Sequence, residues 1–137
     1  MKRTATANWQ GTGKEGKGTL STQSGVLNNQ QYSYGSRFEE GIGTNPEELI
    51  GAAHAGCFSM KLSFILVAAG YTAESIDTKA TVTLENGSIT HVQLDVKAKV
   101  PGMDGEKFAA AAEEAKATCP ISKSLNATIT MNAVFSN

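Results

Sequence analysis

The segment from Leu49 to Ala69 constrains the fold of this chain more than any other part. It is long, contains no proline and is apolar on almost all sides when drawn as a helix. A helix of that kind must be covered over most of its surface. One small sheet can cover only one side, so we expect the remainder of the helix to contact a second subunit in a homodimer.

The start of this helix is predicted from the residues that precede it. Thr44 can serve as the N-cap, Pro46 suits the first turn, and Glu47 stands where a capping box has its acidic residue. Lys61 lies near the middle of the helix, and a charge there costs about 2.5–3.5 kcal/mol in a bilayer. We therefore interpret the segment as a helix buried in protein and expect no membrane partner.

The rest of the chain predicts strands and one further helix. Gly11–Gly18 lacks the lysine and hydroxyl residue of a phosphate loop, so we interpret it as a hairpin connection. Asn86-Gly87 also predicts a hairpin turn. The expected strands are Thr4–Gln10, Lys17–Thr22, Gln31–Phe38, Ala73–Glu85, Ser88–Val100 and Asn126–Phe135, and the expected second helix is Asp104–Thr118.

This order of elements predicts an α+β fold that is largely antiparallel and has no βαβ nucleotide-binding pattern. The length of 137 residues favours a single domain over residues 1–137. Charge is nearly balanced, with 12 basic and 13 acidic side chains and no arginine-rich stripe. Nucleic acid is therefore not an expected partner.

The N-terminal residues predict a compartment and, with it, the use of the two cysteines. Basic residues at Lys2 and Arg3 are not followed by an apolar stretch, so they do not form a signal peptide. We therefore expect a cytoplasmic protein. In a reducing compartment, two cysteines are more often a reactive pair than a permanent structural disulfide.

Cys57 lies inside the long apolar helix, where a cysteine is often inert packing. His54 and Lys61 stand three residues before it and four after it, so either could lie beside the sulfur. A cation there would lower the pKa of the thiol. Each could equally be a solvated or hydrogen-bonded side chain without a role at the sulfur.

Cys119 precedes Pro120, which suggests that it lies at the start of a new helical turn, where backbone N–H groups stabilise a thiolate. It could equally be a cysteine that merely occupies a cap position. A zinc site made from both cysteines with His54 and His91 is the competing use, but none of these residues has finger-like spacing.

Arg37 and Glu47 are candidate partners of a reactive thiolate. A guanidinium stays charged and offers several fixed donors, which suits it to stabilising the charge that moves onto a leaving alkoxide. Glu47 could orient it. On the sequence alone, an arginine in this setting is more often a surface residue, and Glu47 is more often a plain capping acid. Glu47 and Cys57 are separated by about 15 Å along a regular helix. If both belong to one site, the helix must be broken or Glu47 must come from a second subunit.

Several motifs together resemble the OsmC/Ohr family, and in particular its osmotically inducible OsmC branch. The resemblance covers essentially the whole chain, although Gly56 stands where the family commonly has alanine. The motifs that carry it are Gly43–Leu49, Ala52–Met60 and Thr118–Ser122, with Gly18–Asn28, Arg37–Glu39 and Ser75–Thr78 in support.

This resemblance implies an intertwined homodimer in which antiparallel sheets wrap around central buried helices, with two sites at the subunit interface. It implies thiol-dependent reduction of organic hydroperoxides to alcohols, with no haem, flavin or metal cofactor. Cys57 would be the peroxidatic cysteine and Cys119 the resolving cysteine, while Arg37 would hold the thiolate and the peroxide and Glu47 would be its carboxylate partner. The reductant would be an external dithiol, such as a lipoylated protein.

Two other functions remain open at this point. The first is a non-enzymatic dimeric redox sensor or ligand-binding module whose cysteines oxidise only occasionally. The second is a general thiol–disulfide oxidoreductase that acts on proteins.

Overall fold

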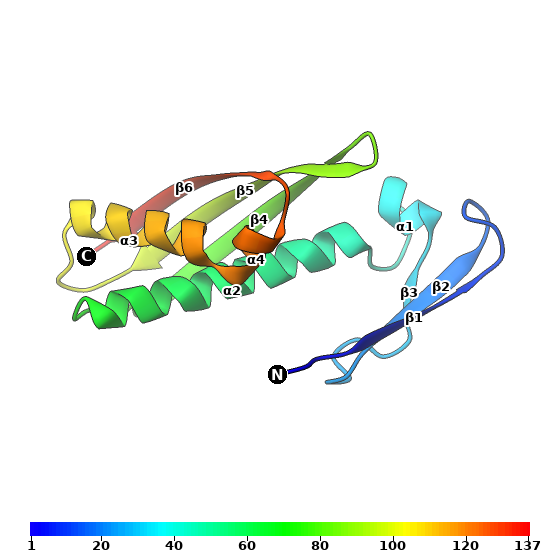
Figure 1. Cartoon of the computed structure of the whole chain (residues 1–137), viewed down its shortest axis with the longest axis horizontal. Coiled ribbons are helices and arrows are strands. Elements are labelled where there is room, and N and C mark those ends of the chain that lie inside the picture. The colour runs from blue at the N-terminus through cyan, green and yellow to red at the C-terminus, as the bar shows by residue number, and fades with distance from the viewer. The chain divides into compact units, whose positions relative to one another are not determined.

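The computed structural model describes residues 1–137, which divide into two compact units, Met1–Leu49 and Ile50–Asn137. The chain contains six strands and four helices, labelled along the ribbon in Figure 1. Helices and two small sheets make this an α+β protein, which confirms the predicted fold class. The single domain expected over residues 1–137 stays a prediction.

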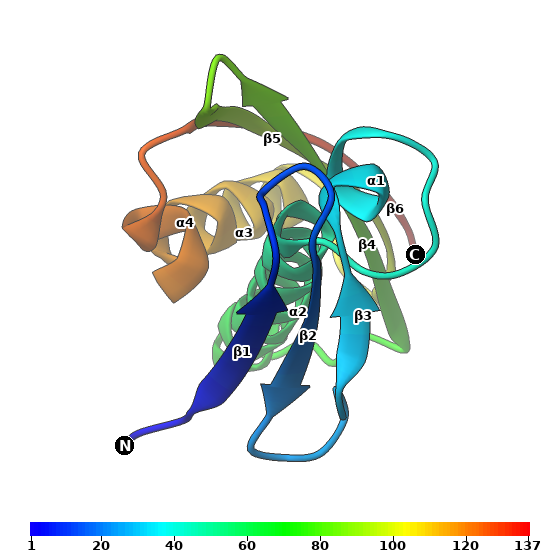
Figure 2. The same cartoon turned by 90° about the vertical axis from the view of Figure 1, so that its right-hand side faces the viewer.

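The first unit contains a three-stranded antiparallel sheet in the order β1-β2-β3. Its strands are β1 (Ala5–Gln10), β2 (Lys17–Thr22) and β3 (Gln30–Tyr32), seen side by side in Figure 2. Gln10 pairs with Lys17 across the first connection. The glycine-rich segment is therefore a hairpin connection, as predicted.

The strand predicted over Gln31–Phe38 is wrong in its second half. After β3 the chain forms a short helix, α1 (Tyr34–Phe38). Ser33 caps it: its side chain accepts a hydrogen bond from the Ser36 N–H, and the Ser36 hydroxyl accepts one from the Ser33 N–H. This reciprocal capping box overrides the period-two pattern of the aromatic residues.

The long helix α2 (Pro46–Ala68) begins in the first unit and continues without interruption into the second. Its cap differs from the prediction. Asn45 Oδ1, and not Thr44, accepts from the Glu48 N–H at 2.8 Å, and the Asn45 side-chain amide donates to the Glu48 carboxylate. Glu48 therefore occupies the position expected for Glu47, which leaves the Glu47 carboxylate available for another partner.

The second unit contains a sheet in the order β4-β5-β6. The strands β4 (Ser75–Glu85) and β5 (Ser88–Lys99) form the predicted hairpin, and Asn86 and Gly87 both have positive φ. One pairing differs from the antiparallel expectation: β5 and β6 (Thr128–Ser136) run parallel. The crossover between these two strands contains the remaining helices and supplies the length that a parallel pair needs.

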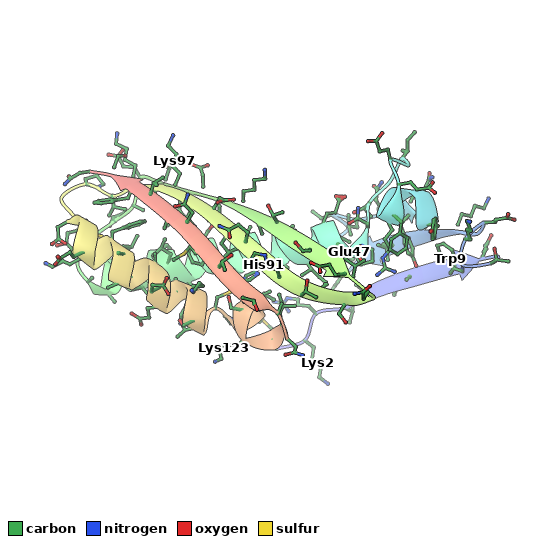
Figure 3. All side chains as sticks on the ribbon, turned by 90° about the horizontal axis from the view of Figure 1, so that it is seen from above. Lys2, Trp9, Glu47, His91, Lys97 and Lys123 are labelled. Atoms are coloured by element: carbon green, nitrogen blue, oxygen red, sulfur yellow. The ribbon has the colours of Figure 1, made fainter.

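The helices of that crossover are α3 (Gly105–Thr118), capped by Asp104, and α4 (Pro120–Ser124). Figures 1 and 2 show α2 and α3 on the same face of the second sheet. His91 and Lys97 lie on the opposite face (Figure 3). The core between helices and sheet is formed by buried side chains of α2, β5 and α3, among them Phe58, Leu62, Leu66, Val92, Leu94, Phe108 and Ala115.

The helix α2 buries one face and exposes apolar side chains on another. Its buried residues recur at the spacing of a single helical face: Gly51, His54, Phe58, Leu62 and Leu66. Met60, Phe64 and Val67 are 64%, 66% and 60% exposed. By length and composition this helix alone could cross a membrane, a test that the core helix of a soluble protein also passes. One sheet thus covers only part of it, as the sequence predicted.

Candidate functional site

The two cysteines of the chain lie in contact with each other. Cys57 is on α2, and Cys119 lies at the junction where α3 ends and α4 begins. Both are free thiols, and their sulfur atoms are 2.8 Å apart although the residues are 62 positions apart in sequence. Pro120 at the first position of α4 forces the chain to start a new turn directly after Cys119. This turn fixes the second thiol against the first.

The surroundings of Cys57 act on its pKa in both directions. Burial raises the pKa of the Cys57 thiol, and the hydrogen bond with Cys119 raises it further. A hydrogen bond with the backbone of Ile121 and the charge of Lys61 lower the pKa, but the net direction is upward. Cys119 is fully buried, whereas Cys57 is partly exposed. Cys57 is therefore the thiol that a reagent can reach, and these neighbours alone do not hold it as a thiolate.

The two residues flanking Cys57 on the helix have different surroundings. Lys61 contributes a favourable charge at the sulfur, as the sequence allowed. His54 is fully buried, and its Nε2 lies 2.7 Å from the Ser122 hydroxyl oxygen. Burial lowers the pKa of His54, so the ring is neutral and does not supply the cation considered for it. His54 is a hydrogen-bonded core residue.

Arg37 and Glu47 form an ion pair within the first unit. Arg37 Nε donates to Glu47 Oε1 at 2.7 Å, and Arg37 Nη2 lies 2.7 Å from the same oxygen. The arginine side chain remains 40% exposed, while that of Glu47 is 14% exposed. Glu47 thus holds one edge of the guanidinium and leaves its other donors free. Figure 3 shows Glu47 at the start of α2.

Aromatic side chains surround Arg37. The guanidinium lies 5.1 Å from the centre of the Phe38 ring, and Phe38 packs against Tyr34. With Trp9 and Tyr32 these residues line a cavity of about 230 Å³. Tyr32, Tyr34 and Phe38 were predicted as strand residues, and Trp9 was not predicted as a site residue. Aromatic residues next to an arginine in the sequence were the available signal.

The four residues predicted to form a site are thus arranged as two pairs. Cys57 contacts Cys119 in the second unit, and Arg37 contacts Glu47 in the first. Glu47 and Cys57 share the uninterrupted helix α2, which separates them by about 15 Å along its axis. Ser122 is a neighbour of the cysteines that sequence analysis did not select.

Comparisons with known proteins agree with this fold. A family model described as "OsmC-like protein" matches residues 39–133 of the chain. The chain belongs to this family. It is 52% identical over 130 residues to proteins called "Peroxiredoxin OsmC" from Escherichia coli (strain K12) and Shigella flexneri, with 92% of this chain and 91% of each relative covered.

Solved structures of OsmC-like proteins share the fold. The OsmC-like protein of unknown function from Vibrio cholerae superposes with a TM-score of 0.76 at 17% identity, over 98% of this chain and 99% of that one. The organic hydroperoxide resistance protein OhrB of Bacillus subtilis superposes with a TM-score of 0.67 at 21% identity, over 96% and 98% of the two chains. At these identities the likeness concerns the fold alone.

Proposed function

We propose that this chain is a thiol-dependent peroxidase that reduces organic hydroperoxides to alcohols through Cys57 and Cys119. The observation that carries the proposal is the contact between two free thiols, 2.8 Å apart, of which one is reachable and the other fully buried. The name of the Escherichia coli relative, a peroxiredoxin, and its 52% identity support a peroxidase. Hydroperoxide and an external reductant are then the partners that the reaction requires.

In the first step the Cys57 thiolate attacks one oxygen of the O–O bond. The new S–O bond gives a sulfenic acid, the O–O bond breaks, and the alkoxide leaves and takes up a proton to become the alcohol. The Arg37 guanidinium, oriented by Glu47, stabilises the thiolate and the charge that develops on the leaving oxygen. The aromatic residues around Arg37 provide an apolar surface for the organic group of the substrate.

In the second step Cys119 attacks the Cys57 sulfenic acid. An S–S bond forms, the S–O bond breaks, and the hydroxyl leaves as water after it takes up a proton. An external dithiol, for which a lipoylated protein is one source, then reduces the disulfide by exchange and restores both thiols. The sulfur contact in the reduced chain supports this step, because Cys119 needs little movement to reach Cys57.

The complete site is built from two copies of the chain in a homodimer. The raised pKa of Cys57 calls for a cation in addition to Lys61. Because α2 is uninterrupted, the Glu47 of the same chain lies about 15 Å along the helix from Cys57. The Arg37–Glu47 pair of a second copy therefore meets the cysteine pair of the first. The exposed apolar side chains Met60, Phe64 and Val67 support such an interface.

The test is turnover of cumene hydroperoxide with dihydrolipoamide as the reductant. We expect many equivalents of alcohol per chain, no turnover with Cys57→Ser, and a trapped sulfenic acid or over-oxidised Cys57 with Cys119→Ser. A reaction that stops after one equivalent would instead indicate the redox sensor. Full turnover by Cys57→Ser would contradict the proposal.

A further inference from the structure

The short helix α4 and the residue before it provide three groups that contact one face of α2. Cys119, which precedes α4, contacts Cys57 through sulfur. The Ile121 backbone hydrogen-bonds to the same cysteine. The Ser122 hydroxyl lies 2.7 Å from Nε2 of His54. Because His54 is three residues before Cys57, the two lie on the same face of α2. The end of α3, where the Cys119 N–H donates to the Ala115 carbonyl, and the position of α4 on this face together set where the second thiol lies.

The hydrogen bond between His54 and Ser122 has the features of a dedicated anchor. The His54 ring is fully buried, its Nδ1 has no partner, and Ser122 is thus the only hydrogen-bonding partner of the ring. None of the five residues of α4 is fully buried, and its one large apolar side chain, Ile121, is only partly buried against the core, so the segment has limited apolar packing to hold it. The other side-chain hydrogen bond of α4, from Ser124 to the Pro120 carbonyl, stays within the helix.

This bond also differs from the other two contacts in what happens to it during the reaction. The sulfur contact and the Ile121 hydrogen bond both involve Sγ of Cys57, which is the atom that gains oxygen when the sulfenic acid forms. The bond between His54 and Ser122 involves neither sulfur and therefore persists through that change. It is the contact that can keep Cys119 close to Cys57 during the interval between oxidation and disulfide closure.

We propose that His54 and Ser122 are positioning residues that hold α4 on α2, so that Cys119 stays within reach of Cys57 while Cys57 carries a leaving group. The inference rests on the proposed function for its role in the cell. The contact between His54 and Ser122 is expected to affect only the rate at which Cys119 attacks the Cys57 sulfur. Loss of the anchor lets α4 move away, slows closure of the disulfide and prolongs exposure of the sulfenic acid to a second peroxide molecule.

A mixed disulfide measures this closure without any peroxide. Cys57, the reachable thiol, is first converted with Ellman's reagent to its thionitrobenzoate disulfide. Cys119 then attacks the Cys57 sulfur, the bond to thionitrobenzoate breaks, and coloured thionitrobenzoate leaves as a thiolate. The first-order rate of release reports the position of Cys119. It does so even if the chain has no peroxidase activity, so failure of the proposed function and failure of this inference give different results.

The variants are chosen as matched pairs. Ser122→Thr and Ser122→Val have the same shape and differ in the hydroxyl, so we expect near-native release from the first and about three- to tenfold slower release from the second, the range for loss of one hydrogen bond. Ser122→Ala should resemble Ser122→Val. In the peroxide reaction the slow variants should also accumulate more Cys57 sulfinic acid at a given peroxide dose, measured by mass spectrometry.

Two control variants separate positioning from stability. Ser124→Ala removes a hydroxyl from α4 without touching α2. Ser59 lies two residues after Cys57 on α2, and its hydroxyl is hydrogen-bonded to that of Thr78 on β4 at 2.7 Å. Ser59→Ala removes this hydrogen bond. Both should release thionitrobenzoate at the native rate, even where their urea unfolding midpoints fall. Equal release rates for Ser122→Thr and Ser122→Val, or slowing by Ser59→Ala as large as by Ser122→Val, would overturn the inference.

Discussion

Cys57 is surrounded by groups that act against one another on its thiol. Burial and Cys119 favour the neutral thiol, whereas Ile121 and Lys61 favour the thiolate. The net effect raises the pKa of Cys57. A peroxidatic cysteine must both ionise and form a disulfide, and these two requirements conflict here. In the proposed mechanism, contact with Cys119 favours disulfide closure but raises the pKa of Cys57, so the thiolate requires a further cation. In the proposed site that cation is Arg37.

The opposed contributions at Cys57 can be tested one at a time. Cys119→Ala removes a neighbour that raises the pKa of Cys57, so the pKa should fall. Lys61→Met removes a favourable charge, so the pKa should rise, while Lys61→Arg should leave it near the native value. The pH dependence of Cys57 alkylation by iodoacetamide measures all three. A pKa in Lys61→Met equal to that of Lys61→Arg would show that this charge does not reach the sulfur.

His54 makes stability depend on pH. Burial holds its pKa below the ordinary value of 6.5 that applies in the unfolded chain. Between these two values the unfolded chain binds more protons than the folded chain. The contribution of His54 to the free energy of unfolding is therefore complete above pH 6.5 and is lost as the pH drops through that window.

His54→Gln removes the titrating group and retains a hydrogen-bonding side chain. Its free energy of unfolding, measured in urea on both sides of pH 6.5, should therefore fall less on acidification than that of the native chain. Carboxylates titrate equally in both proteins and cancel in the difference. Parallel pH profiles for the two proteins would contradict a buried neutral His54.

At the scale of elements, the start of α2 depends on Asn45. Asn45→Ala should lower the free energy of unfolding by about 0.5–2 kcal/mol, since it removes the acceptor of the Glu48 N–H. Asn45→Ser should retain most of the cap. Thr44→Val tests the cap that the sequence suggested and should leave the cap contribution intact. Urea unfolding midpoints of the three variants decide between the two residues.

Elements with one clear local signal could be predicted, whereas those with competing local signals or with distant partners could not. Asn86-Gly87 and the alanine-rich stretch of α3 each contain their own signal, and both elements formed as expected. The helix α1 depends on reciprocal bonds between Ser33 and Ser36, which compete with an aromatic pattern that also suits a strand. Alternation alone does not distinguish parallel from antiparallel strands, so the pairing of β5 with β6 was missed.

In the candidate site, too, some features could be predicted from local sequence and others could not. Locally, Cys57 is a cysteine in an apolar helix and Cys119 a cysteine before a proline, and neither pattern indicates the other residue. Their pairing came from the family resemblance, and their roles stay predictions. Ser122 could not be selected, because a serine in a short turn has no sequence signal for a partner 68 positions away.

For the whole molecule, two pairs of residues must act together although one member of each pair, Glu47 and Cys57, lies about 15 Å from the other along the uninterrupted helix α2. The ion pair of Arg37 and Glu47 and the pair of cysteines are each complete within one compact unit. The large apolar side chains Met60, Phe64 and Val67 of α2 remain exposed beyond Cys57. A symmetric dimer in which each copy supplies both pairs satisfies all three observations, since each cysteine pair then meets the arginine of the other copy.

Mixing two inactive variants tests this shared site. Chains with Cys57→Ser and chains with Arg37→Met should each be nearly inactive alone. After subunit exchange, a mixed dimer has one site with both a native Cys57 and a native Arg37 if the residues come from different copies. Random exchange makes about half of the dimers mixed, each with one of two sites intact, so peroxidase activity should return to about a quarter of the native value.

The matched control distinguishes a shared site from general stabilisation by a partner. Chains with Arg37→Met are mixed instead with chains that carry both Cys57→Ser and Arg37→Met, and no activity should appear, because a native Cys57 and a partner chain are present but no native Arg37 is. If Cys57 and Arg37 acted within one copy, the first mixture would also stay inactive, since neither chain carries both residues. Activity in that mixture therefore depends on an arginine that crosses the interface.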